Sequence, residues 1–418
     1  MKQPSLVLAC HFSYGETSQL SFVKMTDSGF EALSVPLGPE SEKPQHQKPL
    51  YIHAELDKIY CFDPVLKQIN TLTALPKDSP AGYAYHDPKQ NWAWIVNDGD
   101  KETGTDHMNC GEHGSSVSVF NTSSTPTFVK TICLGKGHHV CCFVPADPTN
   151  QIRACVYISN LMDGSISVVN NEPSSHTYLE VVNRISLADV KRDENGSEGI
   201  PNQSFPHGMV YSQLSHKVYS LNNGYETIAV INPATHVIEN VIESPQSSNL
   251  LIHPNGRYIV SKGVDRDSDP DHLTGILSVL DVVTGTRLQT LRLPDIYPST
   301  YKFNLEGSQL FLTTASSGKA KQKQNARVEL LLIFDVLADG SLLQSHTLTL
   351  GRADCSRRPI ALVASGKTTK WIVHPNLTDG SLSILDATTL QTLQTLAVAK
   401  GNAKEVAFSF WNTSFFGT

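Results

Sequence analysis

The chain has 418 residues, a length that usually indicates two or three domains unless the chain repeats one structural unit. Its formal net charge of -7 at pH 7 argues against a non-specific grip on nucleic acid or anionic membranes, because both need a basic face. No stretch approaches the ~20 consecutive apolar residues that a membrane-spanning helix requires, so we expect no such helix.

The cysteines predict the cellular compartment. Eight cysteines without a framework spacing fit reduced thiols, and the apolar run from Leu6 to Cys10 is too short for the core of a signal peptide. We therefore expect a cytoplasmic protein. Most of the cysteines, Cys133 among them, lie in apolar strand-like runs where a thiol packs as a small hydrophobe, whereas Cys110 and Cys355 lie in polar loops.

In chain order, the predicted elements are short strands separated by turn residues. Residues 5–12, 19–25 and 30–37 are typical of three strands that lack a first strand of their own. A four-strand unit then repeats, although the unit from Pro49 to Pro76 is one strand short. No segment shows a sustained 3.6-residue apolar period, so we expect essentially no helix outside loop turns. First strands are expected near Leu50, Gly82, His139, Gly208, Leu250, Tyr301, Ile360 and Val406.

The clearest repeat is a pair of matching segments. NLMDGSISVVN spans residues 160–170, and NLTDGSLSILD spans residues 376–386. Each has an Asp-Gly turn and then alternates small polar with branched apolar residues, which predicts a hairpin leading into a half-buried strand.

These units resemble known propeller repeats. HPNGRYIV at 253–260 and TIAVINP at 227–233 resemble the YVTN-type repeats of seven-bladed propellers, and the first is also similar to lactonase-type propellers. The resemblance covers most of the chain and implies one all-β domain over residues 1–418, a β-propeller of seven or eight four-stranded blades. The last first strand, near Val406, has no blade after it. We therefore expect it to complete the N-terminal blade and to close the ring by pairing of the N- and C-terminal strands.

A propeller predicts which loops share a face. The loop entering each first strand and the loop between the second and third strands lie on one rim, here called the upper rim. Long upper-rim loops are expected at residues 97–115, 189–204, 264–275 and 315–327. His53, His86 and His253 fall at the opposite end of their first strands, where we expect them to cap turns.

Several upper-rim histidines are candidate metal ligands. His138 and His139 enter one first strand and His207 enters the next, while His113 and His374 lie in or near the loops that follow second strands. Converging imidazoles suit copper, iron or zinc, and an adjacent His-His pair with single histidines from other blades resembles the cluster arrangement of nitrous oxide reductase. None of that enzyme's longer motifs is present. The alternative is that these histidines hydrogen-bond loop carbonyls.

Two acidic loops offer the hard oxygen ligands that calcium prefers. The first carries Asp98, Asp100 and Asp106. Neither loop has the twelve-residue EF-hand pattern, and aspartates are also common turn residues. Calcium is therefore a second candidate cofactor. The aspartates of the other loop are Asp265, Asp267, Asp269 and Asp271.

The remaining candidates point to an anionic small molecule. Arg357 and Arg358 enter a first strand, where we expect them to attract an anionic substrate. Asp98 and Cys110 are the other catalytic candidates, as a general base and a thiol ligand or nucleophile. The sequence has no GxSxG elbow, P-loop, HExxH or Cys-x-x-Cys-His motif.

The sequence thus favours a propeller with a metal or small-molecule site in its upper-face funnel. A copper- or iron-dependent oxidoreductase is slightly favoured over a lactonase-type hydrolase. A non-catalytic scaffold that docks a protein partner is the alternative, and it predicts an exposed apolar or aromatic patch on the rim.

Overall fold

The computed structural model is built almost entirely of β-strands. It describes residues 6–14, 18–26, 28–37, 50–55, 58–63, 68–73, 81–87, 92–98, 110, 114–121, 127–137, 140–189, 199–351, 357–403 and 405–409. Its helical elements are the single-turn η1 (Pro148–Asn150) and the short α1 (Ala320–Asn325), as expected for a protein with helix only in loop turns. Within these residues, no helix has the length and apolar character needed to cross a membrane.

The chain divides into two compact units, one of which is residues 50–252. Its strands are β4 (Leu50–Glu55), β5 (Lys58–Asp63), β6 (Gln68–Thr73), β7 (Ala81–His86), β8 (Trp92–Asn97), β9 (Ser116–Asn121), β10 (Thr127–Cys133), β11 (Cys141–Val144), β12 (Cys155–Asn160), β13 (Ser165–Asn170), β14 (Val181–Ser186), β15 (Pro206–Ser212), β16 (Lys217–Asn222), β17 (Thr227–Asn232), β18 (Val237–Glu243) and β19 (Ser247–Ile252).

The other unit joins residues 1–49 to residues 253–418. Its strands are β1 (Leu6–Ser13), β2 (Ser18–Thr26), β3 (Gly29–Leu37), β20 (Tyr258–Asp265), β21 (Thr274–Asp281), β22 (Thr286–Pro294), β23 (Tyr297–Phe303), β24 (Gln309–Ala315), β25 (Leu330–Val336), β26 (Leu342–Thr349), β27 (Ala361–Ser365), β28 (Thr368–Asn376), β29 (Ser381–Asp386), β30 (Thr392–Ala397) and β31 (Glu405–Ser409).

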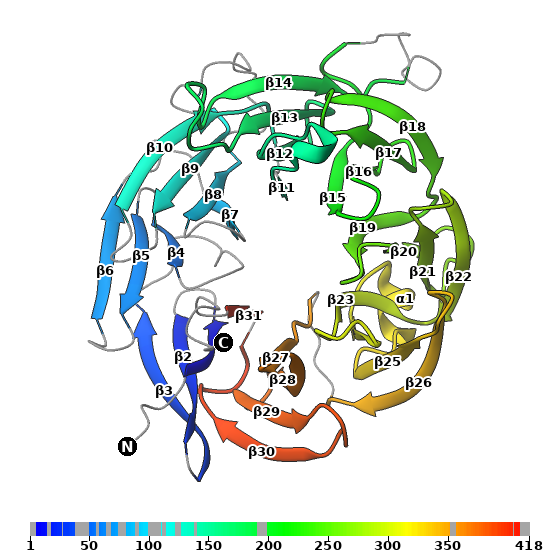
Figure 1. Ribbon diagram of the computed structural model, residues 1–418. Coiled ribbons are helices and arrows are strands. Elements are labelled where there is room, and N and C mark those ends of the chain that lie inside the picture. The colour runs from blue at the N-terminus through cyan, green and yellow to red at the C-terminus, as the bar shows by residue number, and fades with distance from the viewer. Residues whose placement is uncertain are drawn as a thin grey trace. The chain divides into compact units, whose positions relative to one another are not determined.

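The strands form antiparallel meanders, the blade unit of β-propellers (Figure 1). Seven sheets have four strands, and the sheet β4-β5-β6 has three within the described residues. The predicted all-β propeller class is confirmed, and the described residues of the unit at Pro49–Pro76 form three strands. All eight predicted first strands are present, as β4, β7, β11, β15, β19, β23, β27 and β31.

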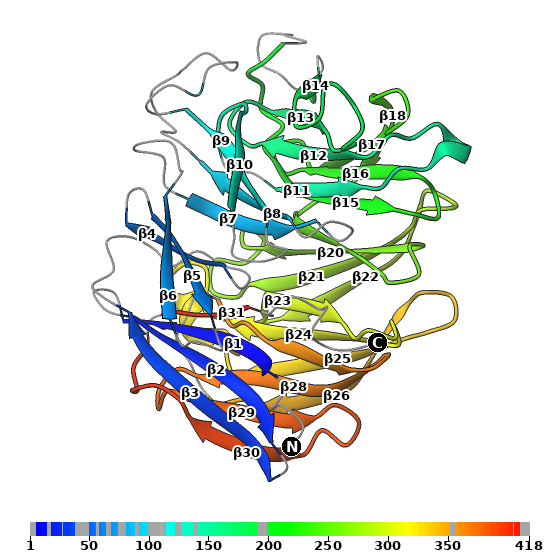
Figure 2. The same cartoon turned by 60° about the vertical axis from the view of Figure 1, so that its left-hand side comes forward.

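The two ends of the chain share one sheet. β31 pairs with β1 in antiparallel register, with Cys10 opposite Phe408 and Phe12 opposite Val406, and β2 and β3 complete the sheet (Figure 2). This pairing was predicted from the missing first strand of the N-terminal blade, and it is confirmed. Closure of the whole ring remains a prediction.

The apolar core lies between neighbouring sheets of each unit. One cluster packs Phe311 and Ile333 of one sheet against Ile360 and Ile372 of the next. The middle strands are buried on both faces, as β13 is along its whole length, whereas outermost strands such as β18 are mostly exposed.

An asparagine at the end of the second strand makes a recurring pair of side-chain hydrogen bonds within the blades. Asn160 Nδ2 donates to Ser165 Oγ and Ser167 Oγ, each at 3.0 Å, and Asn376 makes the same pair of bonds to Ser381 and Ser383. The repeat NLxDGSxS therefore specifies a polar clamp between the second and third strands as well as the turn between them.

Candidate functional site

In unit 50–252, the loop entering β11 meets the turn between β12 and β13. The Lys136 amide donates to Asp163 Oδ2 at 2.8 Å, and the Met162 amide donates to the Lys136 carbonyl at 3.1 Å. The prediction that these two kinds of loop share one rim is correct for this blade. His138 and His139 follow directly and lie outside the described residues, as does His113.

A buried serine brings the ends of the 97–115 loop to the same place. Ser115 Oγ donates to the Asp98 carbonyl and accepts a hydrogen bond from the Gly137 amide at 3.3 Å. The backbone at Asp98 therefore lies close to the backbone that leads into His138, as the sequence predicts. The catalytic role of the Asp98 side chain stays a prediction.

Cys110 corrects one expectation. Its sulfur is bonded to that of Cys133 on β10, with the two Cα atoms 5.0 Å apart. The expectation of reduced thiols is therefore wrong for this pair. A sulfur in a disulfide offers no thiolate, so Cys110 acts as neither nucleophile nor metal ligand in this state. Cys10, Cys141, Cys142 and Cys155 are free and buried, as predicted for cysteines in apolar strands.

The other predicted metal ligands lie in different units. His207, at the start of β15, has Nδ1 3.0 Å from the Ser248 carbonyl oxygen, so this nitrogen donates to the backbone. His374 lies at the end of β28 in the other unit. Among the residues that the structure describes, no three His, Cys, Asp or Glu side chains are grouped to hold a metal ion. The copper, iron or zinc hypothesis stays a prediction.

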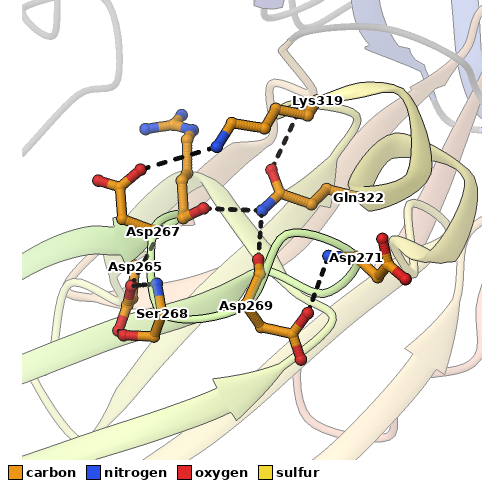
Figure 3. Close-up of polar contacts among 8 residues, drawn as sticks. Asp265, Asp267, Ser268, Asp269, Asp271, Lys319 and Gln322 are labelled. Atoms are coloured by element: carbon orange, nitrogen blue, oxygen red, sulfur yellow. Dashed lines mark hydrogen bonds and ion pairs between the residues drawn. The ribbon is translucent and has the colours of Figure 1, made fainter.

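The second acidic loop is folded on itself rather than open (Figure 3). Asp265 accepts hydrogen bonds from the backbone of Asp267 and from Ser268, and Asp269 accepts one from the Asp271 amide. Gln322 of α1 is buried and donates to the carbonyls of Arg266 and Asp269, each at 2.8 Å. Loop 264–275 is therefore fastened to loop 315–327. Two lysines of loop 315–327 form ion pairs with these aspartates. Lys319 Nζ lies 3.9 Å from Asp267 Oδ1 (Figure 3), and Lys321 Nζ lies 3.1 Å from Asp271 Oδ2.

His253 bears out the predicted turn-capping role. Its ring is buried, its Nε2 donates to the Gly307 carbonyl at 2.7 Å, and its Nδ1 accepts from the Asn255 amide at 3.1 Å. Both ring nitrogens are thus used within the turn.

Basic side chains gather at one place in the other unit, between β20, β23, β27 and β28. We call Lys262, Ser299, Arg357, Arg358 and His374 the cationic cluster. Ser299 joins its two halves, because its Oγ accepts a hydrogen bond from the Arg358 amide at 2.8 Å and its carbonyl accepts one from Lys262 Nζ.

The two adjacent arginines differ. Arg358 is 1% exposed, and its guanidinium donates to the carbonyls of Val328 and Gly351 at 2.8 and 2.6 Å. Arg357 is exposed. The sequence predicts the same substrate-attracting role for both, but the structure gives the Arg358 guanidinium a structural role, which leaves Arg357 as the accessible charge.

Lys262 is the member of the cluster that sequence reasoning missed. It is partly exposed on β20, and its Nζ donates to the Pro298 carbonyl at 3.3 Å and lies 5.2 Å from the centre of the Tyr301 ring. Burial of the ammonium group, and then the charge of Arg357, lower the pKa of Lys262 to about 8. The sequence showed only a lysine in a strand, because its surroundings come from a neighbouring sheet.

His374 is held neutral. It is 5% exposed, and burial, followed by the charge of Arg358, lowers its pKa to about 4. Within the described part of the chain, its Nδ1 is buried and has no hydrogen-bond partner. Burial and then a neighbouring arginine charge thus lower the pKa of both Lys262 and His374.

Comparison with known proteins shows the fold alone. No protein-family model and no curated protein matches the sequence. Among solved structures, the dihydro-heme d1 dehydrogenase NirN has a TM-score of 0.63 at 10% identity, over 98% of this chain and 76% of that one. The periplasmic gluconolactonase PpgL of Pseudomonas aeruginosa has a TM-score of 0.53 at 15% identity, over 86% of this chain and 97% of that one. AztD of Citrobacter koseri has a TM-score of 0.54 at 13% identity, over 96% of this chain and 98% of that one. These likenesses support a β-propeller fold, while the YVTN repeat stays a prediction.

Proposed function

We propose that this protein binds a small anionic molecule at the cationic cluster. The observation that carries the proposal is that Ser299 joins Lys262 to the segment that carries the exposed Arg357, because the Ser299 carbonyl accepts from Lys262 Nζ and its Oγ accepts from the Arg358 amide. Like charges held together repel each other, and a bound carboxylate or phosphate would offset that repulsion. The neighbouring Arg358 adds to the same potential while its own hydrogen bonds go to backbone carbonyls.

Lactone hydrolysis is the reaction class that we favour. The support is the fold that this chain shares with a gluconolactonase, together with the cationic cluster, because opening a sugar lactone yields a carboxylate. His374 is neutral beside Arg358, but a pKa of about 4 makes its imidazole a weak base, so we assign it no proton-transfer role in this reaction.

The metal-dependent oxidoreductase remains the second hypothesis. Its support is limited to the backbone contacts through Ser115, which bring the Asp98 end of one loop to the entry of His138. The cytoplasmic location also remains a proposal. A disulfide such as Cys110–Cys133 is more typical of oxidising compartments, so alkylation of the thiols in freshly lysed cells would test the location directly.

The scaffold alternative has less support. In the part of the chain that the structure describes, the large exposed apolar side chains of the outermost strands are distributed one or two to a strand, as single apolar residues on a protein surface normally are. They are Phe128 and Val129 on β10, Val182 on β14, Val237 and Val241 on β18, Leu288 on β22, Leu343 on β26 and Leu393 on β30.

Isothermal titration calorimetry with inorganic phosphate and with 6-phosphogluconate tests the proposal. Arg357→Gln should raise Kd about tenfold or more, because it removes a charge-assisted contact of roughly 1.5–3 kcal/mol. Arg287→Gln removes the same charge from an exposed position on β22 and should change Kd less than about twofold, as expected for a distant surface charge.

Equal binding by the wild type and Arg357→Gln would refute the anion site. Hydrolysis of glucono-δ-lactone, followed by acid release in a pH-stat, tests the reaction class separately. Anion binding without hydrolysis would leave a binding protein and remove the lactonase proposal.

A further inference from the structure

Lys262 has surroundings that differ from those of an ordinary surface lysine. Its Nζ points toward the start of β23, where it donates to the carbonyls of Pro298 and Ser299 and lies over the face of Tyr301. Tyr301 is itself buried and donates to the Val260 carbonyl at 3.3 Å, so the ring is fixed in place. The ammonium group is therefore held by backbone oxygens and a ring, while the side chain stays partly exposed.

An arginine stands beside this amine. The Arg358 amide is hydrogen-bonded to Ser299 Oγ, which fixes the start of β27 against the residue whose carbonyl accepts from Lys262. Arg357 precedes Arg358 and is exposed, so its guanidinium can meet a ligand from solvent. Ser299 thus brings the Lys262 amine close to the backbone that carries Arg357 and Arg358.

We propose that Lys262 is a carbonyl-reactive amine that captures an anionic aldehyde or ketone as a reversible imine, with Arg357 holding the anionic group. This inference rests on the proposed anion site and names the chemistry of its ligand. The lone pair of Nζ attacks the carbonyl carbon and forms a C–N bond, and the carbonyl oxygen takes up a proton. The resulting carbinolamine loses water as its C–O bond breaks, which gives the imine with no oxidant or reductant.

The electrostatics favour this chemistry at neutral pH. Only the unprotonated amine attacks a carbonyl, and a lysine beside another cation in a partly dry site is the recognised way to obtain it. With its pKa lowered to about 8, Lys262 is unprotonated in roughly a quarter of molecules near pH 7.5, against about one in a thousand for an ordinary lysine. Among the described contacts, Arg357 contributes a charge near Lys262, Tyr301 contributes a titratable ring, and Arg358 is joined to Lys262 through Ser299.

Reductive trapping tests the inference on the full chain. The protein is treated with pyridoxal 5′-phosphate and sodium cyanoborohydride near pH 7.5, and labelled lysines are quantified by peptide mass spectrometry. Lys262 should be labelled at least about tenfold faster than Lys323 and Lys367, which are exposed and serve as internal controls. The rate at Lys262 should rise with pH through a midpoint near 8. Lys262→Arg should remove this label and leave the labelling of Lys367 unchanged.

Matched arms separate the two proposals. Pyridoxal, which lacks the phosphate, should label Lys262 about tenfold more slowly than its phosphate ester, and Arg357→Gln should abolish that preference. Equal labelling by both aldehydes would remove the anion site and keep the reactive amine. Phosphate binding by calorimetry, combined with labelling of Lys262 no faster than Lys367, would overturn the inference and leave the anion site intact. Circular dichroism of each variant confirms that the fold is retained.

Discussion

Acidification from about pH 7.5 to about pH 5 should destabilise the protein through His374. The buried imidazole has a pKa of about 4, against an ordinary value of 6.5 that applies to the unfolded chain. The unfolded state therefore binds a proton first, so the stabilisation is fully present above pH 6.5 and is lost as the pH falls toward 4. At pH 5, these two pKa values correspond to a loss of about 2 kcal/mol in the free energy of unfolding.

Urea unfolding followed by tryptophan fluorescence measures this loss. The decrease in unfolding free energy between the two pH values should be smaller by about 2 kcal/mol in His374→Gln than in the wild type, because the variant has no imidazole at this buried position. His346→Gln is the matched control, since His346 is exposed on β26, and it should keep the wild-type decrease. If His374→Gln loses as much stability as the wild type, the protonation of His374 is not coupled to folding and the argument from its burial fails.

Three further predictions concern the fold and the metal hypothesis. Gly307→Ala should lower the free energy of unfolding in urea by about 1–3 kcal/mol, because the new Cβ would lie 2.6 Å from His253 Cε1 and the backbone φ is +73°. Gly366→Ala is the control, since Gly366 has a similar φ of +65° with open space around it, and it should lower the free energy of unfolding less. Equal losses in the two variants would contradict the clash with His253. Asn376→Ala should cost about 1–2 kcal/mol by breaking the clamp to Ser381 and Ser383, whereas the exposed Asn240→Ala on β18 should be nearly neutral. Untagged protein should carry near-stoichiometric copper, iron or zinc by plasma mass spectrometry, and a His138→Ala/His139→Ala/His207→Ala variant should lose it; no metal in either protein after reconstitution would remove the metal hypothesis.

The sequence predicts the strands of this protein well because its repeats carry local signals. The alternation after each Asp-Gly turn fixes which residues face the neighbouring sheets, and Asn160 and Asn376 mark the ends of second strands. The pairing of β31 with β1 followed from a simple count, because one strand was missing at the N-terminus and one was left over at the C-terminus.

The site was less predictable, because it depends on contacts between sheets. No local pattern shows that Lys262 meets the carbonyls of Pro298 and Ser299, which come from the next blade. The bond between Cys110 and Cys133 was missed for a similar reason, since one cysteine lies within a long loop and the other ends a strand. The sequence shows the local surroundings of each cysteine but not the distance between two cysteines in the fold.

The two adjacent arginines show how one basic dipeptide can serve both stability and binding. The fully buried Arg358 guanidinium satisfies the carbonyls of Val328 and Gly351, and without it these acceptors would lose their partner away from water. After burial, the positive charge of Arg358 also lowers the pKa of His374, which keeps that imidazole neutral. Arg357 has no such structural task among the hydrogen bonds described, yet its charge makes Lys262 harder to protonate. Side chains of like charge that disfavour each other's charged forms lower the stability of the fold, and such destabilising arrangements are found most often at functional sites. An incoming anion resolves the conflict, which is why we place the ligand at the cationic cluster.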